Sequence, residues 1–162
     1  MPRIALQIKV NLENVTNLHF PDDDFRWYLK LKCANCGEET KEFVYVCLAE
    51  SRPLKGGRGS ASLVTKCKLC SRENSIDILK DLISPYDADS SGDFKKIVVF
   101  DCRGVEPTDF SPRTGFAAEA VDSGTVFSDI DLSQKDWADY DERGEQTVGI
   151  YDLEFRFVSF RH

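Results

Sequence analysis

Two pairs of cysteines carry the clearest chemistry in this sequence. Cys33 and Cys36 form one Cys-x-x-Cys pair, Cys67 and Cys70 form a second, and 30 residues lie between the pairs. Two intervening residues let one tight turn aim both sulfurs at the same point, and a second such turn completes a tetrahedron of thiolates around Zn²⁺. Gly37 follows the first pair, where the turn commonly needs a positive φ. The spacing therefore predicts one Zn²⁺ ion per chain, held by these four cysteines.

The zinc prediction has two alternatives, a set of unliganded thiols and a redox dithiol. A thioredoxin-like dithiol needs a strand that leads into a helix, and neither pair precedes a convincing helical pattern. Since four thiolates close the coordination shell of zinc, we expect a structural ion rather than a catalytic one. Cations near the pairs lower the energetic cost of so much negative charge; they are Lys30, Lys32, Lys66, Lys68 and Arg72.

The remaining cysteines and a glycine-rich segment have simpler interpretations. Cys47 and Cys102 lie within or beside apolar strands, where small buried thiols are common, so we expect them in the core. The segment 55–62 contains a Gly56–Gly59 loop that superficially resembles a phosphate-binding loop. It lacks both the Gly-Lys-Ser/Thr ending and the helix that a Walker loop requires, so it is expected to form a glycine-rich turn.

The segments that position the cysteines have the pattern of β-strands. Apolar residues occupy every even position of the segment 4–12, which is the period of a half-buried strand. The segment 25–33 alternates in the same way and leads into the first cysteine pair. The pattern predicts an all-β, mainly antiparallel fold with a β-sandwich or barrel-like architecture and zinc-ribbon-like knuckles at the pairs. Further candidate strands are 43–48, 63–67, 75–79, 97–100 and 147–160.

Two segments fit either a helix or a strand. Residues 76–83 could make two helical turns, and residues 133–140 begin with a Ser-x-x-Asp capping pattern. However, Ile76 and Ile78 alternate with polar neighbours, and the second segment could pair with residues 147–157 across a turn at 142–145. We interpret both segments as strands.

Charge divides the chain into two parts. Residues 1–84 carry 13 lysines and arginines against 11 acidic residues, whereas residues 85–162 carry 8 against 17. Between them, residues 84–93 are rich in turn formers and are expected to make a surface connection. We therefore predict a zinc-binding β half at 1–84 and an acidic, metal-free β half at 85–162, which could form one continuous domain. A faint internal repeat leaves gene duplication open.

Long strings of this sequence resemble a known family, the eukaryotic CXXC motif-containing zinc-binding proteins. The resemblance covers nearly the whole chain and implies zinc at all four cysteines of the two pairs. It also implies an elongated β architecture of two related halves, with metal in the first half only. It implies no reaction, because the family lacks a firm biochemical assignment. The strings that carry it are 4–7, 12–18, 25–30, 54–62, 67–76, 115–119 and 135–142.

Composition narrows the cellular setting. The net charge of −7 disfavours nucleic acid and anionic membranes as partners. No apolar run approaches the ~20 residues that a membrane span needs, and the N-terminal residues lack the apolar core of a signal peptide. We therefore expect a soluble cytoplasmic protein, with access to the nucleus left open and no membrane partner.

These observations favour a non-enzymatic protein with a structural Cys₄ site that acts through contacts with a protein partner. No pair of carboxylates stands out as an acid/base dyad, and no nucleophile motif is present. Trp137 and Tyr140 stand within an acidic string and suggest a docking face for a basic partner on the second half. The acidic residues of that string are Asp129, Asp131, Asp136, Asp139, Asp141 and Glu142.

Two other functions remain open. Soft thiolates also accept Cu(I), so the protein could instead handle metal or exchange thiols, passing zinc or copper to a partner. RNA binding through the lysines around the pairs is a third hypothesis, opposed by the overall charge. The sequence leaves the identity of the partner and the oligomeric state undetermined.

Overall fold

The computed structural model describes residues 2–50, 52–53 and 60–161. Within these residues the chain forms fourteen β-strands and two short 3₁₀ turns, and it contains no α-helix. The prediction of an all-β, antiparallel fold is therefore confirmed. The strands are β1 (Arg3–Glu13), β2 (Val15–His19), β3 (Trp27–Cys33), β4 (Val44–Val46), β5 (Arg52–Pro53), β6 (Ser60–Ala61), β7 (Leu63–Lys66), β8 (Glu73–Ile78), β9 (Lys95–Arg103), β10 (Val105–Ser111), β11 (Phe116–Ala120), β12 (Val126–Ile130), β13 (Trp137–Asp141) and β14 (Gln146–Ser159).

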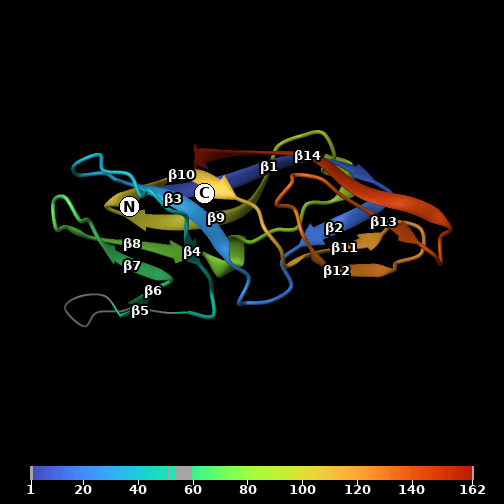
Figure 1. The fold of residues 1–162 in the computed structure, drawn as a ribbon, viewed down its shortest axis with the longest axis horizontal. Coiled ribbons are helices and arrows are strands. Elements are labelled where there is room, and N and C mark those ends of the chain that lie inside the picture. The colour runs from blue at the N-terminus through green and yellow to red at the C-terminus, as the bar shows by residue number, and fades with distance from the viewer. Residues whose placement is uncertain (1, 51, 54–59, 162) are drawn as a thin grey trace.

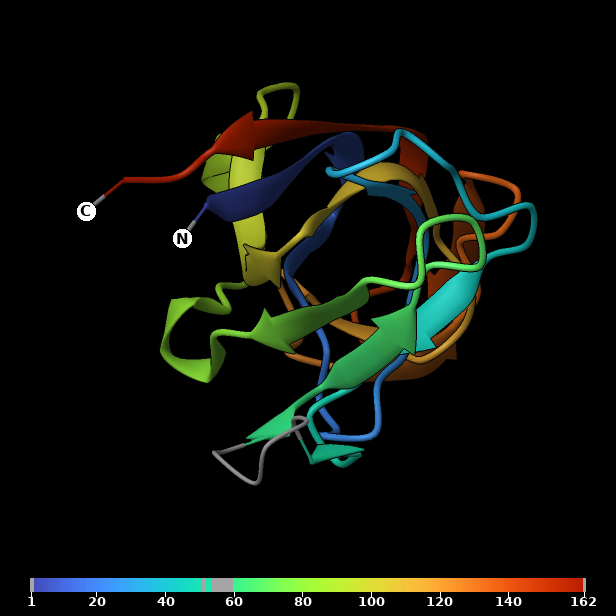
Figure 2. The same cartoon turned by 90° about the vertical axis from the view of Figure 1, so that its left-hand side faces the viewer.

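A six-stranded antiparallel sheet forms the frame of the molecule, in the order β13-β14-β1-β9-β8-β7. Its two longest strands pair from Ile4 opposite Ser159 to Glu13 opposite Gly149. The period of two in β1 places Leu6 and Ile8 in the core with no exposed surface, whereas alternate residues face outward. Seen end-on, the strands curl around an interior (Figure 2), and the buried side chains of the core fill it. This curl gives the barrel-like shape that the sequence predicted.

Two three-stranded sheets complete the enclosure, one in the order β10-β3-β4 and the other in the order β12-β11-β2. The molecule is elongated, with β5–β8 toward one end and β11–β13 toward the other (Figure 1). A continuous core joins these sheets, and its centre is aromatic: the ring centroid of Trp27 lies 4.7 Å from that of Phe25 and 6.3 Å from that of Phe100. Burial of each such ring stabilises the fold by about 1.5–3 kcal/mol.

Strands from both parts of the sequence share the same sheets. In the six-stranded sheet β1 pairs with β9 and β14, and in a smaller sheet β3 pairs with β10. The cysteine-bearing strands of the first part are therefore supported by strands of the second part. The boundary at residue 84 and the relation between the two halves stay predictions.

Each ambiguous segment is a strand only in part. Residues 73–78 form β8, and a 3₁₀ turn at Lys80–Leu82 follows it. Residues 137–141 form β13, which pairs with β14 from Trp137 opposite Ile150 to Asp141 opposite Gln146. The turn between them lies at residues 142–145, as expected.

The connection at residues 84–93 is anchored by one buried side chain. The ring of Tyr86 has no exposed surface, and its hydroxyl group donates to the carbonyl oxygens of Ser90 (2.5 Å) and Asp93 (2.6 Å). Its backbone pairs with Leu18 at the end of β2. The segment crosses the surface, but Tyr86 fixes it to the core, which turn composition alone did not predict.

Candidate metal centre

The first cysteine pair occupies a tight knuckle at the end of β3. The backbone amide of Cys33 donates to the carbonyl oxygen of Glu38, and the amide of Gly37 donates to the carbonyl oxygen of Cys33, both at 2.8 Å. Gly37 has a φ of 81°, the left-handed conformation that the sequence predicted for it. This turn brings Cys36 back over the end of the strand.

The second pair repeats the same hydrogen bonds between β7 and β8. The amide of Cys67 donates to the carbonyl oxygen of Arg72, and the amide of Ser71 donates to the carbonyl oxygen of Cys67, both at 2.9 Å. Ser71 takes the position of Gly37 and has a φ of 63°. The two knuckles thus have matching backbones, although only one of them has glycine at the left-handed position.

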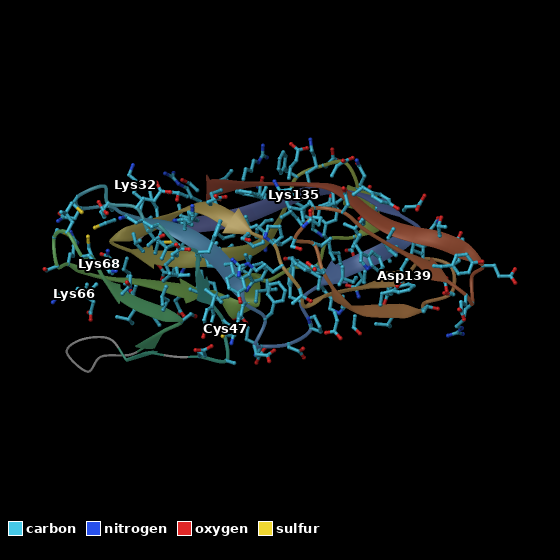
Figure 3. The ribbon with its side chains drawn as sticks, viewed as in Figure 1. Lys32, Cys47, Lys66, Lys68, Lys135 and Asp139 are labelled. Carbon is cyan, nitrogen blue, oxygen red and sulfur yellow. The ribbon has the colours of Figure 1, made fainter. Side chains whose placement is uncertain are left out.

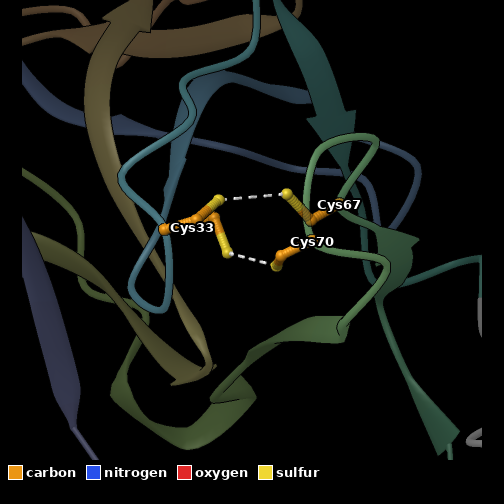
Figure 4. Close-up of side chains that lie close together, drawn as sticks. Cys33, Cys67 and Cys70 are labelled. Carbon is orange, nitrogen blue, oxygen red and sulfur yellow. Dashed lines mark hydrogen bonds between the residues drawn. The ribbon is translucent and has the colours of Figure 1, made fainter.

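The structure brings all four predicted cysteines together (Figure 4). The sulfur atoms of Cys33 and Cys70 are 3.8 Å apart, those of Cys36 and Cys67 are 3.4 Å apart, and all four lie within 4.8 Å of one another. In a tetrahedral site with Zn–S bonds of about 2.3 Å, neighbouring sulfurs are about 3.8 Å apart. The donor set and its spacing therefore fit a zinc ion.

Backbone and side-chain donors favour the ionised form of two of these thiols. The backbone amide of Cys36 is the main group that lowers the pKa of Cys33, which falls to about 6. The side chain of Asn35 is the main group that lowers the pKa of Cys70. Two positions of the cluster are thus prepared to be thiolates, the form that binds metal.

The neighbouring sulfurs act in the opposite direction on Cys36. The backbone amide of Glu38 lowers its pKa, but burial and hydrogen bonds to the other sulfurs, that of Cys67 first, outweigh this amide and raise the pKa to about 12. Negative charges this close together cannot all form unless a cation compensates them. A divalent cation at the centre supplies that compensation and makes four thiolates compatible.

Cations surround the cluster but do not all point at it. Lys32, Lys66 and Lys68 lie at the end of the molecule that carries the cysteine sulfurs (Figure 3), and all three are exposed. The ammonium group of Lys30 instead lies 5.0 Å from the ring centroid of Phe43. The exposed lysines give this end a positive rim that offsets the charge of the thiolates.

Two supporting residues were missed in the sequence. The side chain of Asn74 in β8 is 3% exposed and lies against Cys33. In the orientation that satisfies its amide, the nitrogen donates to the carbonyl oxygens of Gly104 (3.0 Å) and Glu73 (3.2 Å). Gly104 has a φ of 75°, and its carbonyl oxygen also accepts from the amide of Ala34 in the first knuckle (2.9 Å). In the sequence, the only indication of this turn was Gly104 itself, which lies between the segments that form β9 and β10.

The two other cysteines lie outside the cluster. Cys47 is 1% exposed and its thiol donates to the carboxylate of Glu50 (3.4 Å), which matches the core position expected for it. Cys102 is fully buried, and burial raises its pKa to about 12. The Gly56–Gly59 loop lies outside the described residues.

The acidic string of the second half does not form a single face. Asp141 is fully buried and accepts hydrogen bonds from the hydroxyl groups of Ser123 (2.6 Å) and Thr125 (3.0 Å). The ring of Trp137 packs on that of Phe127, with centroids 5.5 Å apart. Asp129, Asp131, Asp136, Asp139 and Glu142 are exposed, and Tyr140 is 50% exposed. Asp139 lies far along the molecule from the lysines of the metal end (Figure 3).

No helix among the described residues is long and apolar enough to cross a lipid bilayer.

Comparisons with known proteins match nearly the whole chain. The sequence profile of the family described as "CXXC motif containing zinc binding protein, eukaryotic" matches residues 5–158. A human protein named "CXXC motif containing zinc binding protein" is 60% identical over 158 residues, which cover 98% of this chain and 99% of the human one. A UPF0587 protein of Nematostella vectensis is 61% identical over 158 residues, with the same coverage of both chains.

Two solved structures have the same fold. The crystal structure of C1orf123 superposes with a TM-score of 0.94 at 59% identity, covering 98% of this chain and 99% of that one. A hypothetical protein from Plasmodium falciparum superposes with a TM-score of 0.89 at 26% identity, covering 98% of this chain and all of the other. The fold and the family resemblance inferred from the sequence are thus both confirmed.

Proposed function

Since this chain belongs to the eukaryotic family of CXXC motif containing zinc binding proteins, we propose that it holds one structural Zn²⁺ ion and acts, without catalysis, through contacts with a partner protein. The ligands are the sulfur atoms of Cys33, Cys36, Cys67 and Cys70. The observation that carries this proposal is the convergence of those four atoms to within 4.8 Å. When bound, the ion supplies a crosslink and charge compensation.

The position of the knuckles supports a structural role. The first knuckle ends a strand of the β10-β3-β4 sheet, and the second joins the last two strands of the six-stranded sheet. A metal held by both knuckles fastens one sheet to the other at the same end of the molecule where β9 runs through Gly104 into β10. Structural zinc in small peptides contributes on the order of 10–16 kcal/mol.

The chemistry of the donor set supports a role outside catalysis. Four sulfur ligands fill a tetrahedral shell and leave no position for water or substrate. The contact surface that we propose for a basic partner is the exposed acidic part of β13 and its preceding loop, where Tyr140 and Asp139 are accessible. An exposed aromatic ring amid carboxylates suits recognition of a basic protein.

Substitution of one ligand tests the metal assignment. Cys67→Ser is expected to lose stoichiometric zinc, measured by elemental analysis of the purified protein, and to unfold at a lower temperature. Cys47→Ser, which removes a buried thiol outside the cluster, is the matched control and is expected to retain one zinc ion per chain. Equimolar zinc in folded Cys67→Ser protein would show that the ligand assignment is wrong.

The partner surface is tested by a charge reversal. Asp139→Lys combined with Tyr140→Ser is expected to abolish recovery of a basic protein that the wild-type chain retains from cell extract. The exposed pair Glu106→Lys and Thr108→Ser, on β10, is the control and should retain it. Equal recovery by the wild type and the β13 variant would place the contact elsewhere.

One observation favours metal transfer as a second function. The side chain of Cys36 is exposed, and a hollow of about 520 Å³ borders Cys33 and Cys67. A partner thiol could reach a metal held there. This function requires that the ion exchange from the folded protein, so a native protein that keeps its zinc in excess chelator and takes up no Cu(I) would exclude it.

A further inference from the structure

The outward side of the β10-β3-β4 sheet carries cations stacked on aromatic rings. The guanidinium carbon of Arg113 lies 3.8 Å from the ring centroid of Tyr28, and that of Arg26 lies 4.3 Å from the centroid of Tyr45. At these distances the rings attract the cations directly. We call this surface the cation–aromatic face; it comprises Arg26, Tyr28, Lys30, Phe43, Tyr45 and Arg113.

The strand register places the two tyrosine rings side by side. Tyr28 in β3 is opposite Tyr45 in β4, and the ring centroids are 6.0 Å apart. The neighbours of Tyr28 along β3, Trp27 and Leu29, are buried on the opposite side of the sheet. The period of two therefore directs both tyrosines, with the arginines stacked on them, away from the core.

The two guanidinium groups keep only part of their donors available. Arg26 uses one on the side chain of Tyr28, and this bond, with the nearby charges of Tyr45 and Glu50, raises its pKa. The ion pairs found within the described part of the chain join other residues, so neither Arg26 nor Arg113 is held by a carboxylate within 4 Å. Arg113 uses its Nε to donate to the hydroxyl group of Ser111 (3.3 Å). Each guanidinium carbon lies over a ring, which restricts its position before any ligand arrives. A planar fork of N–H groups is the geometry that recognises a carboxylate through two hydrogen bonds.

The spacing of the rings indicates what ligand fits. The two guanidiniums stack on rings whose centroids are 6.0 Å apart, so one short extended segment, whose side chains two residues apart project to the same side at about 6.6–6.8 Å, spans a distance of this order. We propose that the cation–aromatic face binds an extended acidic segment of a partner protein, in which two carboxylates separated by one residue each engage one of the stacked arginines. This surface is separate from the metal centre and from the acidic surface of the second half.

The surroundings of the face favour a short acidic peptide over nucleic acid. Base stacking on proteins uses open aromatic faces, whereas the rings of Tyr28 and Tyr45 are already covered by guanidinium groups. On the neighbouring strand, Asp109 is opposite Lys30, and Glu106 is opposite Lys32. These carboxylates would repel a phosphate chain that continues along the sheet but leave room for two carboxylates at the arginines.

An NMR titration of the zinc-loaded full chain tests this proposal. The probe is a peptide with blocked termini whose only charged side chains are two glutamates flanking one serine. We expect the side-chain Nε–H signals of Arg26 and Arg113 to shift along one saturation curve, and the affinity to fall as salt is added. A peptide with glutamines in place of the glutamates should leave both signals unchanged.

Variants separate fork geometry from charge. Arg26→Lys with Arg113→Lys preserves the net charge but removes both forks, and it should weaken binding roughly tenfold or more. Arg143→Lys with Arg161→Lys makes the same change at exposed sites outside the face and should bind the peptide as the wild type does. Circular dichroism and zinc content verify that each variant is folded.

Three outcomes would overturn the proposal. The first two are no binding of the peptide by the wild type and equal affinity for the peptide in the Arg26→Lys/Arg113→Lys variant. The third is that a thymidine oligonucleotide binds through the same two arginines more tightly than the peptide does. The last outcome would make nucleic acid the ligand of this face. The result does not depend on the proposed partner of the acidic half, because the peptide is added directly.

Discussion

Asn74 is the buried amide that connects the first knuckle to the turn after β9. One end of its side chain lies against Cys33, and the other contacts the carbonyl oxygens of Glu73 and Gly104. A neutral amide donates to both carbonyl oxygens without adding charge beside the thiolates. Groups that contact metal ligands in this way commonly change metal affinity 10–100-fold, roughly, when they are replaced.

Asn74→Asp is therefore expected to weaken zinc binding by roughly 10–100-fold. The new carboxylate would lie beside Cys33 and would face two carbonyl oxygens that it cannot donate to. Competition with a chromogenic chelator measures the affinity. Glu73→Asp, an exposed neighbour that keeps its charge, is the control and should bind zinc normally. Unchanged affinity in Asn74→Asp would show that the amide does not support the site.

At the scale of single residues, the sequence predicted the cysteine ligands but not the residues that hold them in place. The four cysteines were identifiable because two intervening residues impose a recognisable turn, and Gly37 could be assigned a positive φ from its position. Ser71 adopts the same conformation without glycine, so its role had no local signal. Asn74 was unidentifiable because its contacts lie across the sheet, on a turn 30 residues away in sequence.

Among the elements, the turn between β9 and β10 has a sequence that the metal end constrains, because its Gly104 lies against Asn74. Gly104 has a φ of 75°, and a Cβ atom at this position would collide with the side chain of Asn74. The turn thus needs glycine both for its backbone conformation and for close approach of the amide.

Gly104→Ala is expected to destabilise the folded protein by about 1–3 kcal/mol, since it combines left-handed strain with a side-chain clash. Urea denaturation of the zinc-loaded protein measures the change. Gly124→Ala is the matched control, because Gly124 has a φ of 73° but open space around its Cβ position. If both variants lose the same stability, the clash with Asn74 contributes nothing.

The loop before β12 is tied to the end of β13 by a buried carboxylate. Hydrogen bonds to Asp141, first from Ser123 and then from Thr125 and the backbone amides of Gly144 and Arg143, outweigh the effect of burial and lower its pKa below the usual 3.8. Because the folded-state pKa is the lower one, ionised Asp141 stabilises the fold above about pH 4. That stabilisation is lost as the pH falls through the folded-state value.

Asp141→Asn should therefore be less stable than the wild type at pH 7, and the difference should shrink as the pH falls below about 4. Denaturant midpoints of both proteins between pH 3 and pH 7 measure this difference, and the shared metal centre cancels in the comparison. Asp139→Asn, at an exposed position of the same strand, should show no such trend. A constant difference in denaturant midpoint at all pH values would mean that the charge of Asp141 does not contribute to stability.

At the element scale, eight of the fourteen described strands were predicted from alternation. The other six, β2, β5, β6, β10, β11 and β12, were not predicted. The long strands β1 and β14 alternate over enough residues to be unmistakable. The expected strand over residues 43–48 is shorter in the structure, at Val44–Val46, because Cys47 turns toward Glu50. Periodicity cannot distinguish the end of a strand from a turn that is equally apolar.

For the molecule as a whole, metal removal is expected to affect one end selectively. Exhaustive chelation should raise amide hydrogen exchange in β3, β7 and β8, which carry or flank the knuckles, while β11, β12 and β13 keep their protection. The reason is that the ion fastens two sheets only at the metal end, whereas the strands of the other end keep their buried side chains, such as Phe116 and Ile130, in the common core. Mass-spectrometric exchange with and without chelator measures this, and uniform loss of protection would contradict a local role.

The overall arrangement was the part least accessible to the sequence. Alternation identifies a strand but not its neighbour, so nothing local specified that β1 lies between β14 and β9 or that β3 pairs with β10. Charge suggested two separate halves, yet residues of both ranges share three of the sheets. Strands this far apart in sequence pair because they bury their apolar faces in a common core, and this core needs strands from both ends of the sequence.

The pairing of β1 with β14 also sets an order of events during synthesis. Glu13 leaves the ribosome more than a hundred residues before its partner Gly149 is made. At about 5–20 residues per second, the nascent chain carries an unpaired β1 edge for roughly 7–30 seconds. Throughout that interval the first strand is an exposed template for other chains, so newly made protein has its greatest need of a chaperone before the last strand emerges.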